Sequence, residues 1–186
     1  MNLASIRQAV RSTGTGWSAR DGARPAPART LFALALSLSL LPPAMLVQSA
    51  SSHPLLQTSA QAPWLRIAVA FFVAQLVAFA VMGWLVRSIG ARYKIDVTLR
   101  DAYLVAAVSP VPMWLSSLGL LIDNVGLTLA IGLAGFWLAE VLAFRQALAL
   151  GAGSEEAVTT AFAARIVGAG LVAWALLLML VAVLAG

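Results

Sequence analysis

Five long apolar runs dominate the sequence and constrain its fold more than any other feature. Only Glu140 places a charge inside one of them, and the runs cover residues 31–48, 67–86, 102–122, 124–144 and 166–185. A helix of roughly 20 apolar residues spans a hydrocarbon core about 30 Å thick. In lipid the backbone must satisfy its own hydrogen bonds, so segments of this length are predicted to be helices rather than the shorter strands of a barrel. The sequence therefore predicts an all-α integral membrane bundle of five transmembrane helices.

The composition excludes a soluble globular protein and several kinds of active site. Hydrophobic residues make up 61% of the 186 residues, charged residues 10%, and the mean hydropathy is +0.93. Cysteine is absent, which excludes disulfides, cysteine-ligated metals and thiol nucleophiles. The single histidine, His53, has no acidic neighbour for a metal site or an acid/base pair, and no phosphate-binding glycine loop is found. We expect no enzyme activity, no cofactor and no metal.

The basic residues are concentrated on one side of the predicted bundle. Ten of the twelve Lys and Arg residues fall in the segment 1–30 or in the connections after the second and fourth spans, where Arg87, Arg92 and Arg145 lie. Basic residues are retained on the cytoplasmic side, which predicts a cytoplasmic N-terminus and a C-terminus outside. The net charge of +5 then reflects topology and attraction to anionic lipids rather than nucleic-acid binding. The excess of Arg over Lys is compatible with a GC-rich bacterial genome, so we expect an inner-membrane protein.

The segment 1–30 is predicted to be a basic cytoplasmic extension that precedes the five-helix domain of residues 31–186. Leu3, Ile6 and Val10 fall on one helical face, which favours a short interfacial helix. Its abundance of Arg and scarcity of acids also fit an organelle presequence, the alternative interpretation.

Three local patterns predict helix boundaries. Thr98 and Asp101 have the spacing of a capping box at the start of the third span. Ser154, followed by acidic residues, predicts that the fifth helix begins near Glu155, ahead of its apolar run. The short connection at Asp123 and Asn124 predicts a tight hairpin between the third and fourth spans.

Prolines lie inside two of the predicted spans. Pro110 and Pro112 are near the middle of the third span, and each removes the backbone donor for the carbonyl four residues earlier. The helix is predicted to kink or unwind there, and broken helices near the midplane of transporters bind ions or substrates. Pro42 and Pro43 raise the same question in the first span.

A purely structural role for these prolines is the alternative interpretation, and the sequence favours it. Ser109, Ser116 and Ser117 could restore the lost hydrogen bonds, together with neighbouring helices. Trp114, in the same segment, is predicted to pack against a helix.

Glu140 and Arg165 are the charges that come closest to the hydrocarbon in the last two spans. They lie twelve residues before and thirteen residues after Ala152, in the middle of their connection, which predicts a similar depth. Two interpretations stay open: the side chains pair near the cytoplasmic boundary, or each extends separately to the interface. Small residues at helical spacing are predicted to pack the bundle; they are Gly132 with Gly135, and Ala157, Ala161 and Ala164 with Gly168.

The order of these features resembles the YIP family of Ypt/Rab-interacting membrane proteins, in particular its bacterial branch. The resemblance extends over nearly the whole chain and rests on Met1-Asn2-Leu3 with Arg7 and Trp17, a basic loop with Gly90 and Arg92, the pattern of Ser109 and Pro112 followed by Trp114 and Leu115, and the loop 153–157. It implies a five-helix membrane protein with a cytoplasmic N-terminus. Eukaryotic members bind prenylated small GTPases, a partner that is not expected for a bacterial member.

The sequence thus predicts a non-enzymatic membrane protein that acts through helix-mediated contacts with lipid, with another membrane protein or with a second copy of itself. The alternative function is a small-solute or ion transporter or channel subunit that uses the third span. In that case the candidate residues are those already singled out: Ser109, Pro110, Pro112, Trp114, Glu140 and Arg165.

Overall fold

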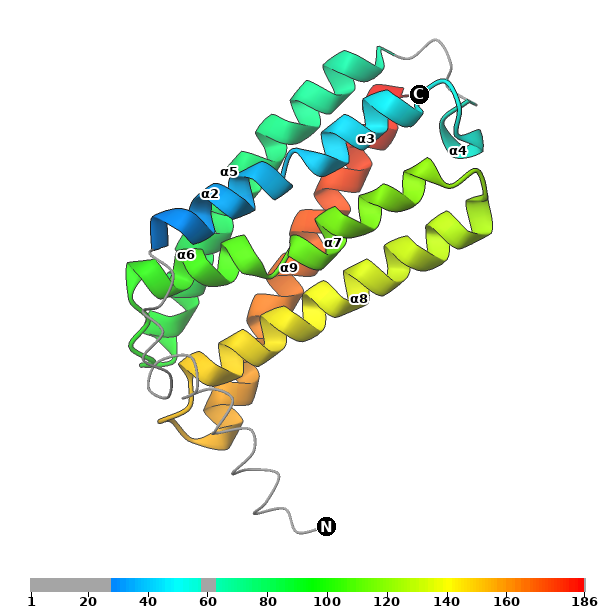
Figure 1. Ribbon diagram of the computed structural model, residues 1–186. Helices are drawn as coiled ribbons and strands as arrows, with labels where there is room; N and C mark the ends of the chain where they lie inside the picture. The colour runs from blue at the N-terminus through cyan, green and yellow to red at the C-terminus, as the bar shows by residue number, and fades with distance from the viewer. Residues whose placement is uncertain (1–27, 58–62, 186) are drawn as a thin grey trace.

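The computed structural model describes residues 28–57 and 63–185, and every regular element within these ranges is a helix. Five stretches are long and apolar enough to cross a membrane: Phe32–Ser49, Trp64–Arg92, Leu99–Leu121, Val125–Leu150 and Glu156–Ala185. They run along one another in an elongated bundle, with the C-terminus at the end opposite the α8–α9 connection (Figure 1). The predicted all-α bundle is confirmed, and the chain is a multi-pass membrane protein. The interfacial helix predicted near the N-terminus lies outside the described residues.

Three spans are single helices and two are broken. The single helices are α5 (Trp64–Arg92), α8 (Val125–Leu150) and α9 (Glu156–Ala185). The first span consists of α2 (Ala28–Leu38) and α3 (Leu41–Ser49), and the third consists of α6 (Leu99–Val108), α7 (Val111–Ser116) and the 3₁₀ turn η1 (Ser117–Leu121). A short helix, α4 (Pro54–Gln57), follows the first span.

Prolines account for the position of both breaks. Pro42 and Pro112 each lie in the first two positions of the helix that follows the break, α3 and α7. The first turn tolerates proline because its backbone N–H groups have no partner within the helix. The predicted interruption of the third span is therefore confirmed. The two broken spans lie against each other, with α2 on α6 and α3 on η1.

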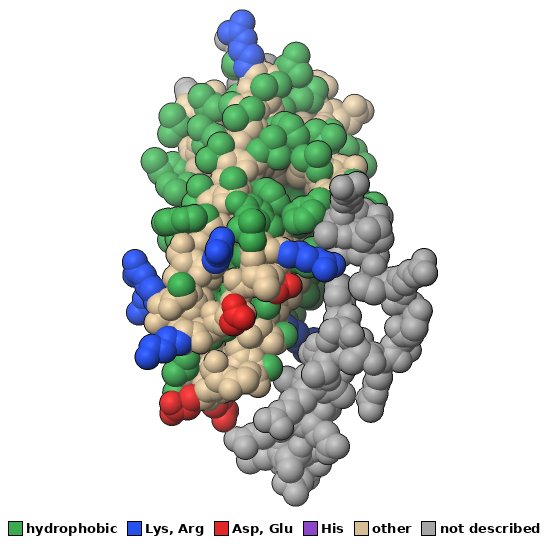
Figure 2. All heavy atoms as spheres, turned by 90° about the vertical axis from the view of Figure 1, so that its left-hand side faces the viewer, with side chains coloured by type: hydrophobic (Ala, Val, Ile, Leu, Met, Phe, Trp, Pro, Cys, Tyr) green, Lys and Arg blue, Asp and Glu red, His purple; other side chains and the backbone are tan. Residues whose placement is uncertain are grey.

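The helices extend further at the charged end than the apolar runs predicted. Arg87 and Arg92 lie on α5 and Arg145 lies on α8, although all three were expected in connections. Hydropathy marks where lipid contact ends, whereas a helix continues into water if its backbone bonds persist. Figure 2 shows the result: basic and acidic side chains gather at the lower end of the view, and hydrophobic side chains cover the upper part.

The predicted caps agree with the structure in most details. The Thr98 hydroxyl accepts from the backbone N–H of Asp101 at 3.2 Å and donates to its carboxylate at 2.6 Å. Asn124 Oδ1 caps α8 by accepting from the N–H of Leu127 at 3.0 Å, which confirms the tight hairpin. The last helix begins at Glu156, one residue later than expected.

Small residues differ in what they pack against. An added Cβ at Gly135 would lie 2.4 Å from Ser116 Cβ and 2.9 Å from the Pro112 carbonyl oxygen, so α7 and α8 approach each other closely there. Gly132 and Gly168 have nothing within 4 Å of such a Cβ, and Ala157 and Ala164 are exposed. The prediction of close packing is correct for Gly135 and wrong for these four residues within this chain.

Candidate functional site

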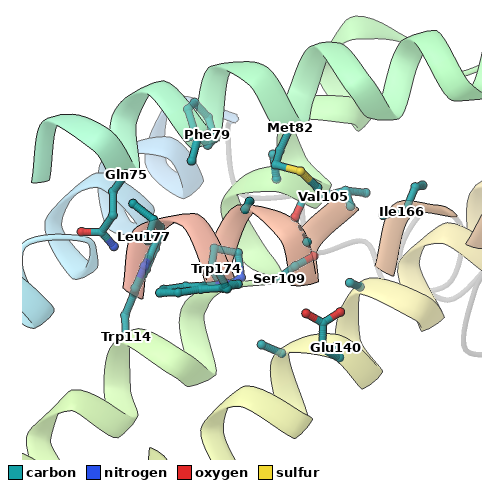
Figure 3. Close-up of a pocket in the computed structure, with 17 residues that line it drawn as sticks. Gln75, Phe79, Met82, Val105, Ser109, Trp114, Glu140, Ile166, Trp174 and Leu177 are labelled. Atoms are coloured by element: carbon teal, nitrogen blue, oxygen red, sulfur yellow. Dashed lines mark hydrogen bonds between the residues drawn. The ribbon is translucent and has the colours of Figure 1, made fainter. Parts of the chain in front are cut away.

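A cavity lies inside the bundle, between α5, the broken third span, α8 and α9 (Figure 3). Its volume is about 80 Å³, and part of it is open to the outside. Its lining extends from the middle of the apolar runs, at Trp114 and Trp174, towards the charged end, where Glu140 is residue 17 of the 21 in the run 124–144. Binding sites for small molecules commonly have volumes of about 300–1,000 Å³, so this cavity is a small one.

Glu140 is the charged group of this cavity. In Figure 3 its carboxyl group points from α8 into the space below Ser109. An added Cβ at Gly170 would lie 3.4 Å from Glu140 Oε1, so the absence of a side chain on α9 leaves room for the carboxyl group. The other oxygen, Oε2, is buried and has no hydrogen-bond partner among the described residues. Buried polar atoms are normally paired, so an unpaired oxygen in a cavity is a candidate ligand-binding atom.

Arg165 does not pair with Glu140 in the structure. Its guanidinium lies 5.4 Å from the centre of the Tyr93 ring, in a cation–π contact. The two residues are also not level, because Glu140 faces Gly170, which lies five residues further along α9, or about 7.5 Å at about 1.5 Å per residue. Distance from the connection does not decide which residues meet, since Glu140 is ten residues before the end of α8 and Arg165 nine residues after the start of α9. The pairing hypothesis is therefore wrong, and Arg165 is not part of the cavity.

The broken third span forms one wall. Ser109, Pro110 and Trp114 line the cavity, together with Ala106, whose carbonyl has lost its usual donor because Pro110 has no N–H. The Ser109 hydroxyl donates to the Val105 carbonyl oxygen at 2.7 Å.

The serine hydroxyls do not restore the bonds that the prolines remove. Ser116 and Ser117 donate to the carbonyl oxygens of Met113 and Trp114, at 2.8 and 2.6 Å. None of these acceptors is the carbonyl of Ala106 or Val108, which the prolines leave without a donor. The predicted repair by serine is therefore wrong.

Gln75 connects the two broken spans and was not predicted. Its side chain is 5% exposed, and its neighbours assign the orientation of its amide. In that orientation the amide oxygen accepts from Trp114 Nε1 at 2.8 Å and the amide nitrogen donates to the Ser39 carbonyl oxygen at 3.2 Å. That carbonyl needs a donor because Pro43, four residues later, has none. The prediction that Trp114 packs against a helix is confirmed. A single amide in the middle of an apolar run was the signal available in the sequence.

A second buried polar cluster lies where α8 begins. His53 is 2% exposed; its Nδ1 accepts from the N–H of Leu55 at 3.2 Å and its Nε2 donates to Thr128 Oγ1 at 3.0 Å. Thr128 in turn donates to the Gly119 carbonyl oxygen at 2.9 Å. These bonds fix the Nε2–H tautomer of the ring. We call His53, Thr128 and Gly119 the His53 cluster; it ties the connection after the first span to η1 and α8.

The structure therefore brings together four of the six candidate residues. Ser109, Pro110, Trp114 and Glu140 line the cavity, whereas Pro112 packs towards α8 and Arg165 lies apart. In the described part of the chain, no group of three or more His, Cys, Asp or Glu residues is placed to hold a metal ion. Comparison of the chain with protein-family models, with curated proteins and with solved structures finds no match.

Proposed function

We propose that this membrane protein binds a small solute in the cavity inside the bundle and passes it across the bilayer, as a transporter or channel subunit. The cavity around Glu140 is the observation that supports this function. Ionisable side chains at membrane depth are costly in free energy and mark substrate or ion pathways in known proteins. The break at Pro110 places a helix end beside the same cavity, an arrangement that transporters use at their binding sites.

The cavity supports this function better than the outer surface supports partner binding. Many large apolar side chains are exposed on that surface, but contact with lipid tails accounts for them without any partner. Helix-mediated binding to another membrane protein, and the resemblance to the YIP family, stay predictions.

We further propose that the chain lies in a bacterial inner membrane with its N-terminus in the cytoplasm. The charge distribution supports this orientation: Arg87, Arg92, Arg100 and Arg145 belong to the end of the bundle that holds the α5–α6 and α8–α9 connections. At the opposite end, Arg66 is the basic residue within the described ranges.

Cysteine accessibility tests the solute-binding function, and the natural absence of cysteine makes the background clean. Ala173 lines the cavity, whereas Ala175 is exposed on the outside of the same helix, about 3 Å further along it. N-ethylmaleimide reacts with thiolates, which form in water and not in lipid. In proteoliposomes we expect Ala173→Cys to be labelled at least about tenfold faster than Ala175→Cys, because only the cavity admits water.

Passage across the membrane is tested with charged, membrane-impermeant methanethiosulfonate reagents added to one face at a time. If the cavity is part of a pathway, reagent added to either face of the membrane should react with the Ala173→Cys variant. If that variant is no more reactive than Ala175→Cys, the cavity is closed to water and the proposed function is wrong. If it is reached from one face only, the cavity binds a solute without passing it.

A further inference from the structure

We infer that the solute of this cavity is a monovalent organic cation, an alkylated ammonium ion with an apolar or aromatic substituent. The inference rests on the proposed function, because it names the chemical class of solute for the same cavity.

The first argument is charge. Among the described residues that line the cavity, Glu140 alone is ionisable, and no basic side chain is present to neutralise it. Arg165, the nearest candidate counter-charge in the sequence, is directed to Tyr93 instead. An unpaired carboxylate in an apolar site is strongly disfavoured, so the Glu140 carboxyl group is neutralised either by a proton or by a cation on the ligand. One uncompensated negative charge matches one positive charge on the ligand.

The second argument is the chemistry of the walls. The aromatic rings of Phe79, Trp114 and Trp174 line the same space as the Glu140 carboxyl group (Figure 3). Indole rings attract ammonium groups through their negative faces, and tryptophan is the strongest of the aromatic residues in this respect. Trp114 Nε1 already donates to Gln75, so this ring offers the ligand its apolar surface rather than its N–H.

The third argument separates an organic cation from Ca²⁺ and Mg²⁺. Ca²⁺ binds six to eight oxygen atoms, and Mg²⁺ requires a near-ideal octahedron of ligands. Besides the Glu140 carboxyl group, the lining holds the Ser109 hydroxyl oxygen and the Ala106 carbonyl that Pro110 leaves without a donor, while the Gln75 amide is engaged on both sides. These oxygens are fewer than either ion requires. An alkylated ammonium ion needs no such shell, since its methyl groups contact apolar walls directly.

The test uses two probes of equal shape and different charge on the full chain in mild detergent. Benzyltrimethylammonium is the cation, and neopentylbenzene, in which carbon replaces nitrogen, is the neutral isostere. Binding is measured by equilibrium dialysis, corrected with protein-free micelles, and by protection of the Ala173→Cys variant from N-ethylmaleimide. We expect the cation to bind at least about tenfold more tightly than the isostere, because only the cation gains the carboxylate and ring-face interactions.

Matched variants assign the preference to particular residues. Glu140→Gln should remove the preference for the cation, whereas Glu155→Gln, the same charge change at an exposed position outside the cavity, should keep it. Trp174→Leu should weaken cation binding, whereas Trp137→Leu should not, because Trp137 is 65% exposed on the outer surface. Faster labelling of Ala173→Cys than of Ala175→Cys, repeated in the Glu140→Gln background, verifies that this variant keeps the cavity.

The outcomes separate this inference from the function on which it rests. Equal binding of both probes, or unchanged cation preference in Glu140→Gln, overturns the cation assignment but leaves a solute-binding cavity. Failure of the cation to bind at millimolar concentration, with Ala173→Cys still reactive, overturns it in the same way. If Ala173→Cys is also unreactive, both the inference and the proposed function are wrong.

Discussion

Two buried polar sites in this protein differ in whether their hydrogen bonds are complete. In the His53 cluster, both ring nitrogens of His53 and the hydroxyl of Thr128 have partners at 2.9–3.2 Å. In the cavity, Glu140 Oε2 is buried without a partner among the described residues. A completed network in a low-dielectric environment stabilises one arrangement of the chain, whereas an incomplete one leaves an atom for a ligand. The comparison therefore separates a polar site that is satisfied within the chain from one with an oxygen available to a ligand.

The largest loss of stability is expected where close packing of two helices shapes the cavity. If the cavity is not held by hydrogen bonds, its walls must be positioned by contacts such as that of Gly135 with α7. Gly135→Ala places a Cβ 2.4 Å from Ser116 Cβ and forces α7 away from α8, so we expect a loss of about 2–3 kcal/mol in the free energy of unfolding. The measurement is unfolding in mixed micelles of mild detergent and dodecyl sulfate, followed by circular dichroism.

Gly132→Ala is the matched control, because an added Cβ there meets nothing within 4 Å. It should leave the free energy of unfolding unchanged or raise it slightly through helix propensity. Equal losses in the two variants would show that the close approach of α7 and α8 does not shape the cavity.

The next largest loss of stability is expected in the His53 cluster, whose hydrogen bonds are complete. Thr128→Val keeps the shape of the side chain but removes the acceptor of His53 Nε2–H and one bond to the Gly119 carbonyl oxygen. Because the buried histidine N–H is left unpaired, we expect a loss of about 2 kcal/mol in the same unfolding measurement. Thr128→Ser, which keeps the hydroxyl, should lose much less. A Thr128→Val variant as stable as the parent chain would mean that the His53 cluster does not stabilise the fold.

A smaller loss of stability is expected at Gln75, which lines the cavity but whose amide has hydrogen-bond partners on both sides. Gln75→Leu leaves Trp114 Nε1 without its acceptor and the Ser39 carbonyl without its donor. Hydrogen bonds between membrane helices contribute about 0.6 kcal/mol on average, so the loss of two of them should lower the free energy of unfolding by about 1 kcal/mol. Gln48→Leu is the control, since Gln48 is an exposed amide on α3. Equal effects of both changes would contradict a specific role for Gln75.

The sequence was sufficient for features that depend on residues close together in the chain. The five spans, the break at Pro110 and the cap at Thr98 follow from apolar length, a missing N–H and a three-residue spacing. Features that depend on the rotation of one helix relative to another could not be predicted from the sequence. Arg165 turns to Tyr93 and Gln75 reaches Ser39 because packing sets which side of each helix faces which neighbour. Hydropathy along the chain contains no information on that rotation.

The cavity itself combines both kinds of feature. Glu140, Ser109 and Trp114 could be selected from the sequence as unusual residues in apolar runs. That Glu140 faces Gly170 rather than Arg165 depends on how α8 and α9 pack against each other. Counting along the chain does not give this, since Glu140 lies ten residues before the end of α8 and Arg165 nine residues after the start of α9.

The smallest effect on stability is expected at Glu140, the residue that matters most for the proposed function. Glu140→Gln removes a charge from an apolar site and breaks no hydrogen bond to Oε2, so the free energy of unfolding should change by less than about 0.5 kcal/mol or should rise. The same variant should lose its preference for the organic cation. A loss of about 2 kcal/mol, equal to that of Thr128→Val, would place Glu140 in a completed network and remove the distinction between the two sites. Unchanged stability with lost binding is the result expected of a ligand site. The Glu140 carboxyl group gains its missing partner, and the free energy of that interaction, only when the ligand binds.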